Sequence, residues 1–224
     1  GGGGKVLVLE GEAEGYMPPS RISPHKPMHY RLGRMLGKGA YGVVYEALLE
    51  TGAVVALKRL DLRRCPPTGG GGGGGCRDSR QTYMVESGVL QKLPDHPHVV
   101  GFLAAEIPPA ATEALIWMEC VSGGSVSAML RTFGALREDT AARFMSHALG
   151  GLIYLHAHRV VHRDVKPANL LVSTCGTVKL GDFGSACVLD TTVGSTCRGV
   201  AGTPNYMAPE MLRIVAAGGG GGGG

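Results

Sequence analysis

The chain has 224 residues, enough for one sizeable domain or two small ones. Its 22 basic and 18 acidic side chains leave a net charge of only +4, too small an excess to predict nucleic-acid binding. No apolar run approaches the roughly 18 residues that a membrane-spanning helix needs, and no signal peptide is visible. We therefore expect a cytoplasmic protein that binds neither nucleic acid nor membrane.

The six cysteines include no CxxC pair and no zinc-finger spacing. Free thiols, as in a reducing compartment, are the expectation. His156, His158 and His162 are close in sequence, but imidazole ligands need a shared face and supporting contacts. We expect no metal on these histidines.

Low-complexity stretches separate or flank the patterned parts of the sequence. Residues 1–29 form a Gly/Pro-rich lead-in, and residues 218–224 form a poly-glycine tail. A third glycine run, 69–75, interrupts a connection between patterned segments. Because glycine has no side chain to bury and a high ordering cost, we expect no regular structure in these runs.

Between these stretches, the hydrophobic pattern changes from strand-like to helical. Short apolar runs predict strands, and apolar residues at helical spacing predict helices. The expected strands cover 32–36, 43–49, 54–60, 98–107 and 114–120, and the expected helices cover 79–93 and 138–158. The fold class is therefore α+β, with a small β lobe followed by a mostly helical lobe.

Two polar tracts carry the strongest functional signal. His162 to Asn169 reads HRDVKPAN, and Asp182-Phe183-Gly184 begins 18 residues after Asp164. Asp164 is a candidate to accept or orient the proton of an attacking hydroxyl. Asn169 and Asp182 offer the hard oxygen ligands that Mg²⁺ prefers.

These tracts resemble those of the eukaryotic protein kinases. The resemblance implies ATP and Mg²⁺ as cofactors, and a role for Lys166 in neutralising the transferred phosphoryl group. It also implies a bilobal protein-kinase fold. The N-lobe and hinge would cover 30–121, with five strands and one helix, and an incomplete, mostly α-helical C-lobe would cover 122–217.

A glycine-rich stretch lies at the first strand turn and supports this reading. Gly37, Gly39 and Gly42 would let backbone N–H groups approach phosphate oxygens. A strand-like segment follows, whereas a dinucleotide-binding loop would open a helix, and the absence of GK[ST] excludes a Walker A loop. An ordinary glycine hairpin is the structural alternative.

A lysine inside an apolar strand supplies the next element. Lys58 ends the run Val54-Val55-Ala56-Leu57-Lys58, where a buried ammonium needs a charged partner such as a nucleotide phosphate. Glu86, on the expected helix, is the candidate that would hold it in place. An exposed edge-strand lysine and an exposed helix glutamate are the alternatives.

The resemblance also implies an adenine site. Met118 matches the gatekeeper position, and the Glu119 carbonyl and Val121 amide would meet the adenine edge. Ala56 and Leu171 would sandwich the base. The residues implied to contact the nucleotide are Leu36, Gly37, Gly39, Gly42, Val44, Ala56, Lys58, Met118, Glu119, Val121 and Leu171.

Substrate class and control follow from the resemblance too. Lys166 together with Thr203, whose hydroxyl would hold Asp164 and Lys166, looks like the serine/threonine class. The segments 116–126 and 202–210 look like the MAP kinase kinase kinase and Ste20-like branch, which implies a protein substrate such as a downstream kinase. Arg163 implies activation by an upstream kinase. The candidate sites are Thr191, Thr192, Ser195 and Thr196, with the last two favoured.

The match to the family ends soon after Glu210. There, Glu210 would pair with an arginine from a later helical lobe, and a long buried helix would support the catalytic tract. Neither is in this sequence, so we expect a C-terminally truncated kinase with the apolar face of the 138–158 helix exposed. The alternative is a catalytically inactive remnant that serves as a nucleotide-binding or scaffold module.

Overall fold

The computed structural model describes residues 29–39, 42–63, 79–108, 112–189 and 201–218. The predicted lead-in up to residue 28, the 69–75 glycine run and the 219–224 tail lie outside the described residues. So do the four phosphorylation candidates between 191 and 196.

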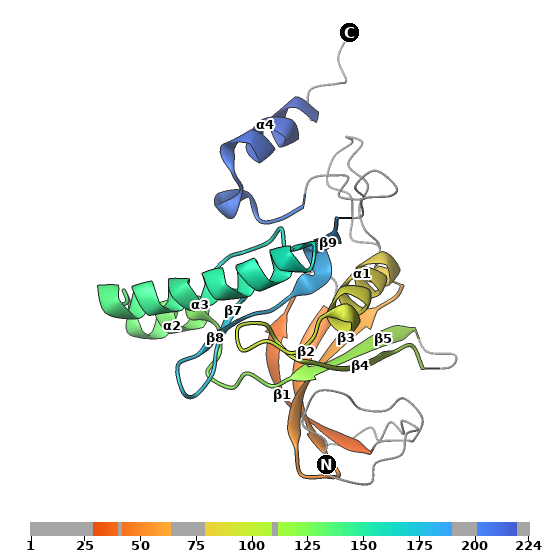
Figure 1. The fold of residues 1–224 in the computed structure, drawn as a ribbon. Coiled ribbons are helices and arrows are strands. Elements are labelled where there is room, and N and C mark those ends of the chain that lie inside the picture. The colour runs from red at the N-terminus through yellow and green to blue at the C-terminus, as the bar shows by residue number, and fades with distance from the viewer. Residues whose placement is uncertain (1–28, 40–41, 64–78, 109–111, 190–200, 219–224) are drawn as a thin grey trace.

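A five-stranded antiparallel sheet and one helix form the N-lobe. The strands are β1 (Tyr30–Lys38), β2 (Gly42–Leu49), β3 (Val54–Asp61), β4 (Phe102–Glu106) and β5 (Glu113–Glu119), in the order β1-β2-β3-β5-β4. Helix α1 (Ser79–Lys92) packs across β3, β4 and β5, as Figure 1 shows. The predicted lobe of five strands and one helix is confirmed.

Strand β3 is buried on both faces, which explains its apolar sequence. Val55 and Leu57 face a cluster that includes Tyr30 and Trp117, whose rings meet edge to face with centroids 4.7 Å apart. The alternate residues, Ala56 and Leu60, face the larger core under α1. Because side chains alternate along a strand, Lys58 points to that second side.

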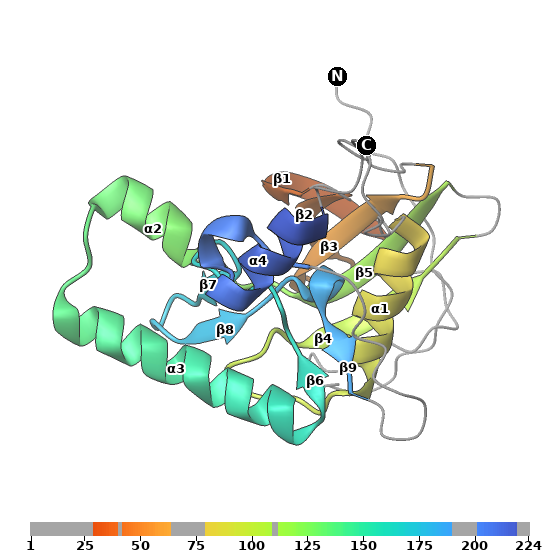
Figure 2. The same ribbon diagram turned by 90° about the horizontal axis from the view of Figure 1, so that it is seen from above.

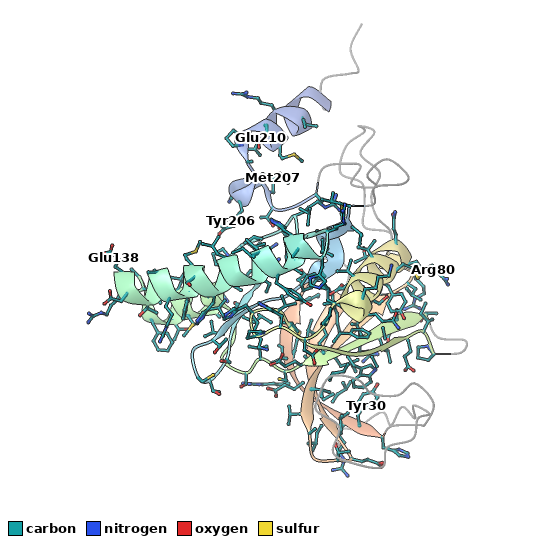
Figure 3. The ribbon with its side chains drawn as sticks, in the orientation of Figure 1. Tyr30, Arg80, Glu138, Tyr206, Met207 and Glu210 are labelled. Atoms are coloured by element: carbon teal, nitrogen blue, oxygen red, sulfur yellow. The ribbon has the colours of Figure 1, made fainter. Side chains whose placement is uncertain are left out.

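In the part of the chain that the structure describes, the C-lobe has three α-helices, four strands of two or three residues and two 3-10 helices. Its elements are α2 (Val126–Phe133), α3 (Glu138–Ala157), β6 (Val160–Val161), β7 (Leu170–Val172), β8 (Val178–Leu180), η1 (Phe183–Ser185), β9 (Cys187–Val188), η2 (Pro204–Tyr206) and α4 (Pro209–Gly218). The β7–β8 hairpin lies between α2 and α3, and β6 pairs with β9 (Figure 2). Figure 3 shows Tyr30 and Glu210 toward opposite ends of the molecule.

Three elements differ from the sequence prediction, one of them α4, a helix that was not predicted and that includes Gly218, the first residue of the expected tail. Residues 98–100 do not belong to β4, because their hydrogen bonds run to the other lobe. Val100 N–H donates to the Leu180 carbonyl, and Leu180 N–H donates to the His98 carbonyl, each over 2.9 Å. The third difference is α2, a short helix that was not predicted, whose first turn is capped by the Ser125 hydroxyl accepting from Ala128 N–H.

Helix α3 presents an apolar row to solvent. Phe144, Ala148 and Leu155 are buried. Met145, Leu149 and Ile153, four residues apart, are 54%, 52% and 71% exposed. The expected exposure of an apolar face on this helix is therefore observed.

Two adjacent glycines in α3 allow the 93–100 segment to lie against the helix. A Cβ on Gly151 would come within 2.6 Å of the His98 carbonyl oxygen, and one on Gly150 within 3.1 Å of the His98 ring. Glycine inside a helix costs about 1 kcal/mol relative to alanine. Close packing of the segment requires this glycine pair despite its low helix propensity.

Three cysteines are in the described part of the chain. Cys120 and Cys175 are free, whereas Cys187 is disulfide-bonded. The prediction of free thiols is therefore wrong at Cys187, because spacing in the sequence does not reveal which thiols meet in the fold. No described helix is long and apolar enough to cross a membrane.

Candidate active site

Lys58 and Glu86 form a buried ion pair between β3 and α1. The Lys58 ammonium donates to both Glu86 carboxylate oxygens, over 2.8 and 2.6 Å. Glu86 is completely buried, and Lys58 is only 9% exposed. The pair fixes the helix against the sheet and orients the ammonium, which sequence reasoning anticipated.

The ammonium also reaches Asp182, a contact that was not predicted. Lys58 Nζ donates to Asp182 Oδ1 over 2.8 Å. Burial alone would lower the pKa of Lys58, but attraction to Glu86 and Asp182 outweighs burial and raises it. The same attraction to Lys58 lowers the pKa of Asp182, so both groups are charged at neutral pH.

The β7–β8 hairpin brings the two candidate metal ligands together. Asn169 directly precedes β7 and Asp182 follows β8 by two residues. Pairing of Leu170 with Leu180 places Asn169 beside Gly181, whose N–H donates to the Asn169 carbonyl over 2.9 Å. Asp182 has a positive φ of 60°, in the left-handed region, and the chain enters η1 directly after it.

A compact network surrounds the Asp164 carboxylate. Lys166 Nζ donates to Asp164 Oδ2 over 2.7 Å. Asn169 Nδ2 donates to the Asp164 carbonyl over 2.8 Å and to Oδ2 over 3.1 Å. Two side chains from its own loop therefore hold the carboxylate, and Asp164 as a whole is only 9% exposed.

Thr203 completes this network from a distant segment. Its hydroxyl donates to Asp164 Oδ1 over 2.8 Å and accepts from Lys166 Nζ over 2.7 Å. These are the contacts expected of Thr203. The adjacent Gly202 has φ +120°, and a Cβ there would lie 2.6 Å from the Arg163 carbonyl oxygen, so the segment approaches the 162–169 loop through its backbone.

Neighbouring residues fix the backbone of the 162–169 loop. The buried His162 donates from Nε2 to the Gly181 carbonyl over 3.0 Å and accepts from Asp164 N–H at Nδ1 over 3.3 Å. Burial lowers the pKa of His162, consistent with this neutral tautomer. Arg163 Nε donates to the Ser185 carbonyl over 2.7 Å, which ties the loop to the residues after Asp182.

The predicted nucleotide-contacting residues line β1, β2, β3 and the segment after β5. Leu36 and Gly37 are on β1, Gly39 follows it, and Gly42 and Val44 are on β2. A Cβ on Gly42 would collide with the Arg59 carbonyl oxygen, so glycine permits the close approach of β2 to β3. Residues 40 and 41, at the tip of this loop, lie outside the described residues.

The hinge residues connect the two lobes. Ala56 and Met118 are paired across β3 and β5 and are both nearly buried, and Leu171 on β7 packs against the same core. In the described residues the Val121 N–H has no hydrogen-bond partner, which leaves it available to an acceptor. The Glu119 carboxylate accepts from Gly101 N–H and Lys179 Nζ, two contacts that were not predicted.

Comparison with known proteins agrees with this geometry. The protein kinase domain model matches residues 30–219. The chain belongs to the protein kinase family. It is 35% identical over 194 residues to human mitogen-activated protein kinase kinase kinase 3, covering 85% of this chain and 30% of that protein.

Two further relatives show the same pattern. Cytokinesis protein sepH of Aspergillus niger is 38% identical over 189 residues, which is 84% of this chain and 13% of that protein. Mitogen-activated protein kinase kinase kinase 2 of Arabidopsis thaliana is 33% identical over 209 residues, which is 89% of this chain and 30% of that protein. The chain thus spans less than a third of the length of these relatives.

Proposed function

We propose that this chain is the catalytic part of a serine/threonine protein kinase that transfers the γ-phosphoryl group of ATP to hydroxyl groups of proteins. The observation that carries the proposal is the assembly of Lys58, Glu86 and Asp182 into one ionic cluster beside the Asp164 network. Phosphoryl transfer depends chiefly on positioning and on charge neutralisation. Lys58 and Lys166 supply fixed positive charges for the phosphates, and Asp164 supplies a fixed carboxylate for the substrate hydroxyl.

Each cluster has a distinct part in this chemistry. Asp164, held by Lys166 and Thr203, orients the substrate hydroxyl and accepts its proton. Lys166 lies against the same carboxylate and neutralises negative charge on the transferring group. Lys58, fixed by Glu86, binds the α- and β-phosphates. The glycine loop and the Val121 N–H hold the phosphates and the adenine edge.

The residues present fit a bound Mg²⁺. Asp182 uses only Oδ1 for Lys58 and has a half-exposed side chain. In the described residues, the Asn169 Oδ1 oxygen has no hydrogen-bond partner, because its contacts use Nδ2. Two protein oxygens completed by phosphates are the usual magnesium arrangement. Held by Asn169 and Asp182, Mg²⁺ would neutralise the phosphate oxygens.

Phosphate transfer from radiolabelled ATP to a generic protein substrate tests the proposal. The native chain should label serine and threonine in the presence of Mg²⁺, and EDTA should remove the signal. D164N, which keeps the side-chain volume, is the matched control and should be inactive. Labelling by D164N equal to that of the native chain would refute the assigned chemistry.

We further propose that the substrate is another kinase in a MAP-kinase-type cascade. Support comes from the relatives named mitogen-activated protein kinase kinase kinase, to which the chain is 33–35% identical. We propose phosphorylation of Thr196 or Ser195 by an upstream kinase, with Arg163 receiving the phosphate. Purified MAP kinase kinases should be labelled faster than a generic substrate such as casein. Equal rates would reject this substrate class while leaving the kinase activity intact.

A further inference from the structure

Five aromatic rings form a continuous stack between α3 and the 93–100 segment. His158 and Tyr154, at the end of α3, have ring centroids 4.3 Å apart, and Tyr154 stacks on His96 at 4.3 Å with planes 13° apart. His96 then meets His98 edge to face at 5.6 Å. His98 stacks on His147, again from α3, at 4.5 Å and 17°.

Hydrogen bonds fix the protonation state of His96 and His147, the two rings on either side of His98. The backbone N–H of His98 donates to His96 Nδ1 over 3.2 Å. The backbone N–H of Val178 donates to His147 Nδ1 over 3.2 Å. Because an N–H donor must face a lone pair, Nδ1 carries no proton in either ring. Both are therefore neutral imidazoles.

The ring between them has the opposite arrangement. His98 Nδ1 lies 3.1 Å from the Val178 carbonyl oxygen and must donate to it, since a carbonyl can only accept. His98 and His147 are thus joined to the two backbone groups of Val178 by complementary bonds. A proton added to His147 Nδ1 would face the Val178 N–H, and the resulting cation would stack on His98 4.5 Å away.

We propose that this ring stack is a pH-sensitive joint, which holds the 93–100 segment on α3 while His96 and His147 are neutral and releases it in mildly acidic solution. Protonation at either Nδ1 abolishes an acceptor and places two donors against each other. The positive charges on His96 and His147 then lie on either side of His98, in rings that each contact it.

The charged groups around the stack favour its neutral form on balance. Burial lowers the pKa of His147, and the nearby positive charges of His98 and Arg143 lower it further. Burial is also the largest cause of the lowered pKa of His96. His98, Lys179 and His158 lower this pKa further. Asp95 and Glu119 line the same cavity of about 330 Å³ as His96, but the Glu119 carboxylate already accepts from Lys179 and Gly101.

The position of the joint connects it to the active site. The 93–100 segment directly follows α1, which carries Glu86. It also forms backbone hydrogen bonds with Leu180, two residues before Asp182. Loosening the segment therefore loosens both acidic partners of Lys58, so phosphoryl transfer should weaken along with stability as the stack becomes protonated.

The direction of the effect follows from linkage. A histidine whose pKa is lowered in the folded state binds its proton first in the unfolded chain. Stability is thus fully present above the ordinary histidine range near pH 6.5 and is lost as the pH falls below it. His162, also with a lowered pKa, adds a similar contribution that is independent of the stack.

Urea unfolding of the 224-residue chain at pH 7.5 and 5.5 tests the proposal. In H96N/H147N, the Asn Oδ1 can replace Nδ1 as an acceptor but cannot take up a proton in this range. The native unfolding midpoint should fall between the two pH values, and the double variant should show at most half that fall. H156N, at an exposed position of α3 outside the stack, should behave like the native chain.

Imidazole ¹⁵N spectra of the native chain provide a second test that requires no variant. Nδ1 of His96 and His147 should show the shift of an unprotonated acceptor at pH 7.5, and both rings should titrate below the ordinary histidine value of about 6.5. An unchanged pH dependence in a folded double variant would overturn the proposal. So would titration of both stack histidines at or above that ordinary value, whether or not the variant folds.

Discussion

Thr203 and Asp164, separated by 39 residues of sequence, share a hydrogen bond of 2.8 Å in which the hydroxyl donates to the carboxylate. The same hydroxyl accepts from Lys166, so one side chain fixes both charged groups of the proposed phosphoryl-transfer centre. The segment that follows Gly202 therefore contributes directly to the geometry of the 162–169 loop.

Replacing Thr203 should reduce turnover more than substrate binding. T203A removes the donor to Asp164 Oδ1 and the acceptor for Lys166, so the carboxylate is less well oriented. We expect kcat to fall about 10- to 100-fold, the scale on which small misplacements affect rate, with little change in the KM for ATP. T203S retains the hydroxyl and is the matched control. Equal losses in both variants would contradict a role for the hydroxyl.

The Lys58→Met substitution should abolish transfer and also destabilise the fold. It leaves the fully buried Glu86 without its cation, and breaking one side of a buried pair costs about 3–5 kcal/mol. Burial raises the pKa of Glu86 and Lys58 opposes that effect, so the carboxyl should become easier to protonate. Urea unfolding and radiolabel transfer measure the two losses separately.

The double variant K58M/E86L separates stability from chemistry. With an apolar side chain in place of each buried charge, most of the lost unfolding free energy should return. Transfer should remain abolished, because no ammonium is left to bind phosphate. Recovery of activity in the double variant would remove Lys58 from the proposed mechanism.

Glycines inside α3 and α1 should respond oppositely to replacement by alanine. In G151A, the new Cβ would lie 2.6 Å from the His98 carbonyl oxygen, and overpacking of this kind costs about 1–3 kcal/mol. A Cβ on Gly88, inside α1, would meet nothing within 4 Å. G88A should therefore be neutral or stabilise the chain by up to about 1 kcal/mol. Urea unfolding of both variants measures the difference.

ATP and Mg²⁺ should raise the unfolding temperature of the chain together, and chelating the metal should remove most of that rise. Groups that bind only the folded state raise the unfolding temperature. We expect ATP with Mg²⁺ to raise it in the native chain and ATP with EDTA to do so much less. D182N should lose most of the magnesium-dependent part. A D182N chain that responds to Mg²⁺ like the native chain would exclude Asp182 as a ligand.

Much of the site could be predicted because its residues occur in short tracts at fixed spacing. Asp164 and Asn169 are five residues apart, and a single hairpin returns the chain to Asp182. The partnership of Lys58 with Glu86 could be inferred from burial of a charge in an apolar strand. The roles assigned to the nucleotide-contacting residues stay predictions, although the structure places them along β1, β2, β3, the hinge and β7.

Long-range contacts were harder to predict because local pattern does not encode them. The apolar run 98–107 resembles one strand, yet Val100 bonds to Leu180 and only the later residues join the sheet. The eight-residue α2 is too short for a clear helical period. The second partner of Lys58 and the ring stack depend on residues far apart in the chain, and no sequence pattern marked them.

The backbone bonds between the 93–100 segment and β8 give the two lobes a second attachment besides the chain passing through Val121. Lys179 also bonds to Glu119 across the lobes, so separating them would break backbone and side-chain contacts together. Lys58 and Asp182 belong to opposite lobes and are 2.8 Å apart. Any separation of the lobes would lengthen the gap between this ammonium and this carboxylate, and the same movement would set the room available for a triphosphate.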